Sequence, residues 1–162
     1  MNRYVLTNLP GDLKLSEPPR RKANLLPLPA LLAQLLGEGR WRQPSDECIA
    51  DAIPVLSDPV DFLSERGMRS ESSIRLDDDP RFPNLHEYRG SEGEARPLPW
   101  RDVELSLLIA VNREIGVDIA IALDYRTGFD DPRVLASEWV GSEILWCEIF
   151  PSFTAFVSRF NL

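Results

Sequence analysis

Hydrophobic and polar positions alternate through the last third of the chain. Over residues 104–112 the apolar side chains recur at every second position, and the same period continues over residues 117–125. A period of two is typical of a β-strand, and the short polar stretch between the two segments predicts an antiparallel hairpin. Further strands are predicted at residues 133–140 and 143–150, each preceded by turn residues. We therefore expect a four-strand antiparallel meander.

A helical period follows this predicted sheet. After Pro151 comes Ser152, a residue type favoured at the N-cap of a helix. Four apolar side chains then fall at the i, i+3, i+4 and i+7 positions of one helix face. They are Phe153, Phe156, Val157 and Phe160. We expect this closing helix to bury them against one face of the sheet, which makes the fold class α+β with a mostly antiparallel sheet and helices packed on it.

Three shorter helices are predicted nearer the N-terminus, at residues 28–37, 45–55 and 59–68. In the first, Pro29 suits the first helical position and Gly37 suits a left-handed C-terminal cap. Its apolar residues surround nearly the whole helix, which predicts burial on more than one side. Ser45 and Asp58 are the expected N-caps of the other two. The inward-facing side chains of the third are expected to be Val60, Phe62 and Leu63.

Length and composition fit one globular domain that spans residues 1–162. Hydrophobic residues make up 43% of the chain and charged residues 27%, which is close to the average for folded proteins. Twelve of the 14 prolines lie in residues 1–100. We expect residues 1–26 to form an extended arm and residues 70–100, which are dense in turn signals, to form no long element.

The charge of the chain is unevenly distributed. The net charge is −8, but residues 1–45 carry +4 and residues 46–162 carry −12. Such an acidic balance argues against a nucleic-acid partner, which usually requires a basic face. Two interpretations remain open: a solvated acidic surface, or an acidic face that meets a basic partner. The longest uncharged stretch, residues 23–37, is too short and too interrupted by proline to cross a membrane. It follows three basic residues, 20–22, in the order of an export signal, but such a signal would begin twenty residues late and would lack a small-residue cleavage site. We therefore expect a cytoplasmic protein.

The residues that carry chemistry are sparse. A single histidine, His86, excludes a site with two imidazoles, and two cysteines cannot form a four-thiolate zinc site. Cys147 alternates with apolar neighbours in a predicted strand, which favours a small core residue over a nucleophile. There is no nucleophile elbow and no lysine-bearing phosphate loop. Asp102 and Glu104 are close in sequence, as chance predicts among 26 carboxylates. We therefore predict no catalytic residue, no metal site and no cofactor.

Several residues are candidates for contact with a partner. Tryptophan is favoured at interfaces, and the three tryptophans that one core does not readily accommodate are Trp41, Trp100 and Trp139. The acidic candidates are Asp77, Asp78, Asp79 and Asp124. Three consecutive aspartates could ligate a hard cation, but adjacent side chains cannot all point inward, and the calcium-loop spacing is absent. They are more typical of a solvated turn. For Asp124 the alternative is structural, with its carboxylate paired to Arg126 or Arg133.

The order of motifs near the C-terminus resembles that of the SUKH superfamily, which includes fungal cell-wall-synthesis regulators and bacterial immunity proteins. Residues 119–126 read Ile-Ala-Ile-Ala-Leu-Asp-Tyr-Arg, and residues 131–134 read Asp-Pro-Arg-Val. A strand region with Trp139 and Trp146 follows, and then Pro-Ser-Phe-Thr-Ala-Phe at residues 151–156. The resemblance covers about residues 103–162, somewhat more than a third of the chain. The first hundred residues match the family poorly.

This resemblance implies an α+β domain that acts by binding and has no catalytic apparatus. Bacterial members often neutralise a toxin domain, frequently a nuclease. The first expectation is therefore an immunity protein that binds a basic toxin domain through an acidic surface. The alternatives are a regulatory scaffold that docks on signalling or cell-envelope-synthesis proteins, and an acid-type hydrolase that uses carboxylates.

Overall fold

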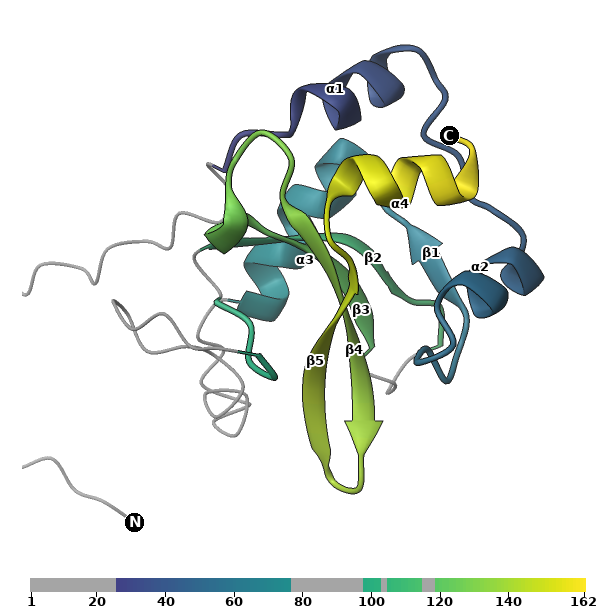
Figure 1. Ribbon diagram of the computed structural model, residues 1–162, viewed down its shortest axis with the longest axis vertical. Helices are drawn as coiled ribbons and strands as arrows, with labels where there is room; N and C mark the ends of the chain where they lie inside the picture. The colour runs from purple at the N-terminus through teal and green to yellow at the C-terminus, as the bar shows by residue number, and fades with distance from the viewer. Residues whose placement is uncertain (1–25, 77–97, 103–104, 115–118) are drawn as a thin grey trace, which may run out of the picture.

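The computed structural model describes residues 26–76, 98–102, 105–114 and 119–162. Within these ranges the chain forms a five-stranded antiparallel sheet, four α-helices and one short 3-10 helix (Figure 1). The strand order is β1-β2-β3-β4-β5, so every strand pairs with its neighbour along the chain. The predicted α+β class and the C-terminal meander are confirmed, and one strand, β1, is added to them.

The meander agrees closely with the alternating pattern. Its strands are β2 (Ser106–Asn112), β3 (Ala120–Asp124), β4 (Arg133–Val140) and β5 (Glu143–Phe150), the last two with the predicted bounds. Residues 115–118, which include the start of the predicted second strand, lie outside the described residues. Tyr125 was expected to continue that strand, but it begins the 3-10 helix η4 (Tyr125–Thr127). The Asp124 side chain causes this turn, because it accepts a hydrogen bond from the backbone N–H of Arg126.

The first two predicted helices are present with shorter bounds. They are α1 (Ala30–Gly37) and α2 (Asp46–Ala52), and Ser45 caps α2 by accepting a hydrogen bond from the N–H of Cys48. Two expectations for α1 are wrong. Only Leu32 and Leu35 are fully buried, so the helix packs through one face. The left-handed residue after the helix is Gly39, with φ +65°, while Gly37 is still helical.

The predicted helix at residues 59–68 is wrong. The segment is divided into a strand, β1 (Val60–Phe62), and a helix, α3 (Glu65–Leu76). Val60 and Phe62 pair with β2 at Asn112 and Ala110, and this long-range pairing overrides the local helical pattern. Ser64, not Asp58, caps the helix, since its hydroxyl accepts a hydrogen bond from the N–H of Gly67.

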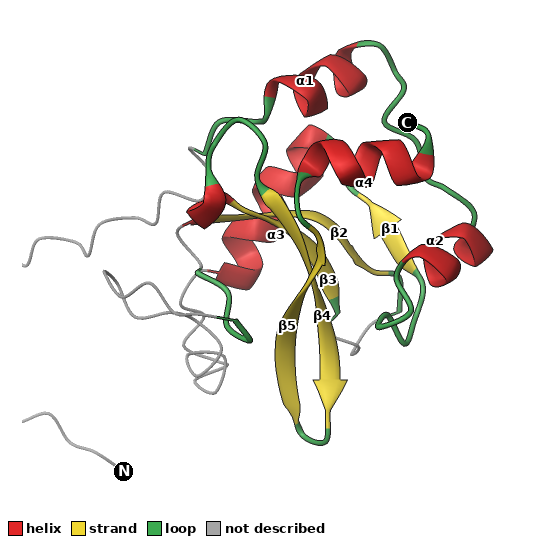
Figure 2. Cartoon of the chain, in the orientation of Figure 1, coloured by secondary structure: helices red, strands yellow, loops and turns green. Residues whose placement is uncertain are grey.

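The main core lies between one face of the sheet and helices α1, α2 and α4 (Phe153–Phe160) (Figure 2). The four predicted apolar side chains of α4 are all buried, and Ser152 caps the helix by accepting from the N–H of Ala155. Phe156 is central, with ring centroids 5.5 Å from Phe150 and 4.9 Å from Phe160. The closing helix is thus confirmed in its position, cap and buried face.

The opposite face of the sheet carries a smaller apolar cluster. It consists of Leu108, Val111, Ala120, Ala122, Leu135 and Trp146. Beside β5, the segment 98–102 runs close enough for the N–H of Trp146 to donate to the carbonyl of Pro99 at 2.8 Å. Arg101 places its guanidinium carbon 4.6 Å from the centroid of the Trp146 ring. At the far side of the sheet, the N–H of Leu108 donates to the hydroxyl of Ser72 on α3 at 2.9 Å. Both apolar faces of the central strands are therefore packed.

Candidate functional site

The β4–β5 hairpin is longer than the sheet that supports it. The last pair between β3 and β4 is Ile121 with Ala136, whereas β4 and β5 continue to pair as far as Val140 with Glu143. Residues 138–145, here called the hairpin tip, therefore form a two-stranded ribbon that projects from the body of the protein (Figure 1). The loop at its end has Gly141 at φ +66°, the left-handed conformation that a two-residue hairpin loop requires.

Apolar side chains are exposed at this tip. Trp139 is 42% exposed and Val140 is 50% exposed. Among the described residues the one further large exposed apolar side chain is Phe129, whose ring lies 5.4 Å from that of Tyr125. Two of the three exposed large apolar side chains of the described residues are therefore adjacent in sequence, in the hairpin tip.

A buried charge cluster, made of Asp124, Arg126 and Arg133, lies at the base of the same hairpin. The carboxylate of Asp124 has no exposed surface. It accepts hydrogen bonds from Nε and Nη2 of Arg126 and from Nε of Arg133, each at 2.8 Å. Arg133 also donates to Glu148 on β5 at 3.2 Å. Ionic contacts therefore connect the end of β3 to both strands of the hairpin.

The charge state of this cluster follows from its contacts. Burial by itself would raise the pKa of Asp124, but the hydrogen bonds from Arg126 and Arg133 outweigh it and hold the pKa below its ordinary value. A carboxylate that stays ionised and is held by two guanidinium groups is poorly suited to accept a proton from a substrate. The cluster therefore stabilises the fold, as the structural alternative for Asp124 predicts.

Two of the described contact candidates share a partner, since Nη2 of Arg126 donates both to the carbonyl of Trp100 and to the carboxylate of Asp124. Trp41 lies instead in the aromatic core, and Trp139 lies in the hairpin tip. Trp41 stacks on Phe62 with a centroid distance of 4.7 Å, and its indole N–H donates to the carbonyl of Leu63 at 2.8 Å. Trp41 and Asp124 thus have roles within the fold, and neither is retained as a contact candidate. Trp100 is half-buried in the segment beside β5, and its carbonyl accepts from Arg126.

The other predicted residues divide between the surface and the undescribed part of the chain. Trp139 is the predicted contact residue that lies exposed on a projecting element. The candidates Asp77, Asp78 and Asp79 lie outside the described residues, as does His86. Cys147 is half-buried in β5, and burial raises the pKa of its thiol, which disfavours the reactive thiolate.

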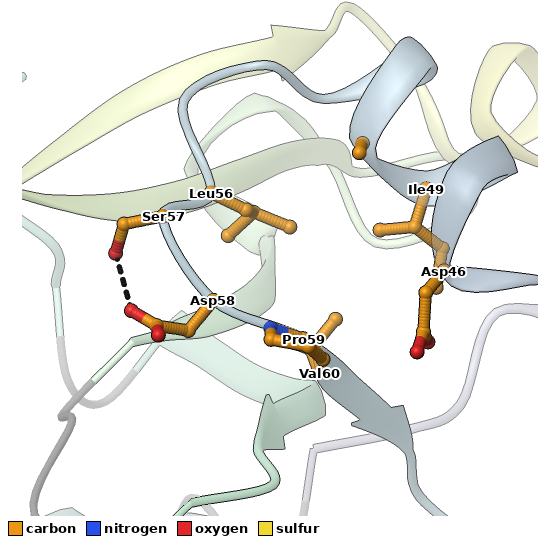
Figure 3. Close-up of a pocket in the computed structure, with 8 residues that line it drawn as sticks. Asp46, Ile49, Leu56, Ser57, Asp58, Pro59 and Val60 are labelled. Carbon is orange, nitrogen blue, oxygen red and sulfur yellow. Dashed lines mark hydrogen bonds between the residues drawn. The ribbon is translucent and has the colours of Figure 1, made fainter.

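A small pocket opens between α2 and the segment that leads into β1 (Figure 3). Its volume is about 150 Å³, and Ile49, Leu56 and Val60 supply most of its apolar wall. The two carboxylates at its rim are already engaged: Asp46 accepts from Arg113 at 3.0 Å, and Asp58 accepts from the hydroxyl of Ser57 at 2.7 Å. Sites for small organic ligands usually occupy about 300–1,000 Å³. This pocket is smaller than that range and offers no unengaged carboxylate.

Two wider hollows are open to solvent. One, of about 650 Å³, lies between α1 and α3 and is bordered by Leu28, Leu36 and Arg69. The other, of about 400 Å³, lies near the end of α4 and is bordered by Arg40, Arg42 and Phe160. Nowhere in the described ranges do three or more histidine, cysteine or acidic side chains gather as a metal site would require. No helix among the described residues is long and apolar enough to cross a membrane.

Comparison of the chain with family models, with curated proteins and with solved structures finds no match. The resemblance to the SUKH superfamily therefore depends on the C-terminal motifs alone and stays a prediction.

The sequence indicated Trp139 as a contact candidate but did not indicate the overhang of the hairpin. The second strand was predicted over residues 117–125, whereas β3 as observed has five residues and β4 and β5 have eight each. A shorter neighbour leaves the far end of a hairpin without a third strand.

Proposed function

We propose that this protein is a non-catalytic binding domain that neutralises a basic toxin domain by protein–protein contact. The observation that carries the proposal is the placement of charge. Residues 46–162 have a net charge of −12, and Asp124 is the one acidic side chain that is buried among the described residues. The other acidic side chains of the described residues therefore reach solvent, where they attract a basic partner and accelerate encounter.

A non-catalytic role is supported by the carboxylates of Asp124 and of the small pocket, which already have hydrogen-bond partners. Asp124 is ionised and engaged by two arginines, and the carboxylates of the small pocket are also engaged. Enzymes usually hold a titratable group with a perturbed pKa beside a cleft of substrate size. Within the described residues these two features do not coincide. The resemblance of residues 119–156 to the SUKH pattern adds the expectation that the partner is a toxin domain.

The test begins with affinity capture on the immobilised protein from a lysate of the source cell, at low and then at moderate salt. We expect one basic protein that binds at low salt, and an association rate that falls steeply as salt rises. The Phe156→Ala variant, whose core is disrupted, is the negative control. The captured protein is then purified, and its enzymatic or toxic activity is measured with and without an equimolar amount of the binding domain.

Loss of that activity in the mixture supports neutralisation. An unchanged activity at saturation contradicts it. An association rate that is independent of salt contradicts attraction between the acidic surface and a basic partner. Recovery of a signalling or cell-envelope enzyme that remains active in the complex favours the regulatory scaffold instead.

A further inference from the structure

We propose that the hairpin tip, residues 138–145, is the surface that enters the partner, and that it fits a recess lined by lysine and arginine side chains. This inference rests on the proposed function and adds the site of contact and the chemistry of the site that receives it. Three independent features support it: the exposed apolar side chains, the local charge, and the rigid attachment of the hairpin to the sheet.

The apolar side chains of the hairpin tip are exposed although the rest of the described structure is well packed. Both faces of the central strands are covered, and 27 apolar side chains among the described residues are buried. Trp139 and Val140 nevertheless remain 42% and 50% exposed on adjacent positions of one strand. Among the described residues β3 ends before the tip, so no third strand pairs with β4 beside Trp139. Partially exposed tryptophans of this kind are the residue type most enriched among energetic hot spots of interfaces.

The charge around the hairpin tip favours a basic partner. From residue 134 to residue 158 the chain contains three glutamates and no lysine or arginine. Arg133 neutralises one of them, Glu148, at 3.2 Å, and the other two, Glu138 and Glu143, belong to the hairpin tip. An aromatic residue flanked by two acidic positions is complementary to a basic surface and is repelled by an acidic one.

The narrow shape of the hairpin tip suits a recess on the partner better than a flat surface. The tip is a ribbon of two strands that extends past the third strand of the sheet (Figure 1). A narrow projection buries little area on a flat surface, but inside a recess it can bury both of its faces. A cleft that binds an anionic polymer offers both the recess and the basic side chains. The tip would occupy such a cleft with Glu138 in the place of an anionic group.

The attachment of the hairpin lowers the cost of binding. At its base Asp124 accepts 2.8 Å hydrogen bonds from Arg126 and Arg133, and Arg133 reaches on to Glu148. The segment beside β5 adds the bond from the N–H of Trp146 to Pro99. Because the root of the ribbon is held on both sides, less conformational entropy is lost when its end is fixed in a complex. Asp124 is therefore a positioning residue for the tip and does not touch the partner.

Site-specific photo-crosslinking in the source cell tests the placement directly. The probe is p-benzoylphenylalanine, introduced at position 139 and, as a matched control, at position 129. Trp139 and Phe129 are both exposed aromatic side chains, but Phe129 lies after η4, away from the hairpin tip. We expect an adduct with one protein of basic isoelectric point from position 139 and none from position 129. An adduct from position 129 alone, or adducts of equal yield from both, overturns the assignment of the tip.

Binding measurements on the captured basic protein complete the test. We expect Trp139→Ala to weaken the complex by at least about tenfold, mainly through faster dissociation, and Phe129→Ala to leave it unchanged. Glu138→Gln is expected to slow association and to reduce its salt dependence, whereas Asp130→Asn, which removes an exposed charge elsewhere, changes neither. We expect Trp139→Ala to keep the circular dichroism spectrum of the wild type, since its side chain is 42% exposed and belongs to neither of the two buried clusters.

The outcomes separate this inference from the proposed function. If a basic partner is captured and neutralised but binds Trp139→Ala with wild-type affinity, the proposed function stands and the hairpin tip is not its site. If no protein of basic isoelectric point is captured or cross-linked, both the function and the tip are rejected.

Discussion

Replacement of the buried carboxylate, Asp124→Asn, gives the sharpest test of how the sheet and hairpin are held together. The substitution keeps the size of the side chain and removes its charge. One oxygen becomes an NH₂ group, which donates hydrogen bonds and does not accept them. In the wild type the two carboxylate oxygens accept from Arg126 and Arg133, whose side chains are only 10% and 19% exposed. In the variant, the arginine N–H groups that pointed at the replaced oxygen face the new NH₂ group, so they have no acceptor there.

The size of the loss follows from the contacts. Oδ1 accepts from the backbone N–H and Nε of Arg126, at 3.1 and 2.8 Å, and Oδ2 accepts from Nη2 of Arg126 and Nε of Arg133, both at 2.8 Å. Whichever oxygen is replaced, about two hydrogen bonds to a charged group are lost, at about 1.5–3 kcal/mol each. Removal of one partner of a buried ion pair typically costs about 3–5 kcal/mol. Because the arginines keep some contact with water, we expect about 3 kcal/mol, a large part of the usual 5–15 kcal/mol of a domain.

The assay is urea unfolding followed by tryptophan fluorescence, at a series of pH values from neutral to acidic. The pKa of Asp124 is lowered in the folded state, so its contribution is complete above its unfolded pKa of about 3.9 and is lost as the pH falls through the folded value. The difference in free energy of unfolding between the wild type and Asp124→Asn should therefore be greatest near neutral pH and shrink below about pH 4.

The matched control is Asp46→Asn, which removes a carboxylate that pairs with Arg113 in the same bidentate manner, at the surface of the protein. Solvent screens that pair, and its loss is expected to change the unfolding midpoint little. A difference below about 1 kcal/mol for Asp124→Asn at neutral pH would refute the reasoning. So would a difference that is constant across the acid range, because the charge would then contribute nothing.

Further substitutions test other parts of the fold. Phe156→Ala should lower the free energy of unfolding by about 3–5 kcal/mol, because its ring is fully buried; urea unfolding with no loss would contradict the packing of α4. Ser64→Ala removes the N-cap of α3 and should cost about 1 kcal/mol by thermal or urea unfolding, whereas Asp58→Ala, which removes the cap expected from the sequence alone, should cost less. Gly141→Ala places a side chain at φ +66° with open space around it, so backbone strain alone should lower the free energy of unfolding by about 1 kcal/mol. An unchanged unfolding midpoint would contradict strain in this turn. Cys147 should react with a thiol reagent near neutral pH more slowly than an unfolded cysteine, since burial raises its pKa; equal rates would contradict its position.

The sequence by itself determined the elements whose pattern is local and long. The bounds of β4 and β5 agree with the prediction, as do the N-caps Ser45 and Ser152 and the buried face of the closing helix. In these segments the side-chain period, the turn residues and the caps all favour the same structure. Local consistency of this kind is what makes a pattern readable without knowledge of the fold.

Tertiary structure decided the segments in which local and long-range preferences differ. Residues 60–62 have apolar positions that suit a helix or a strand, and only the backbone groups offered by β2 made them a strand. The sequence predicted two possible roles for Asp124, and the choice was made when folding brought Arg126 and Arg133 to the same buried carboxylate. Hydrogen bonds and ion pairs between distant residues leave no periodic trace along the chain.

The candidate surface shows the same division. The sequence identified Trp139 as a contact candidate from its residue type, together with Trp41, and could not tell the two apart. The structure separates them, because Trp41 stacks on Phe62 in the core while Trp139 stands where the hairpin has passed the end of β3. Residue type and charge are properties of the sequence. Exposure depends on which strands and helices fold back to cover a side chain, and only the tertiary structure settles that.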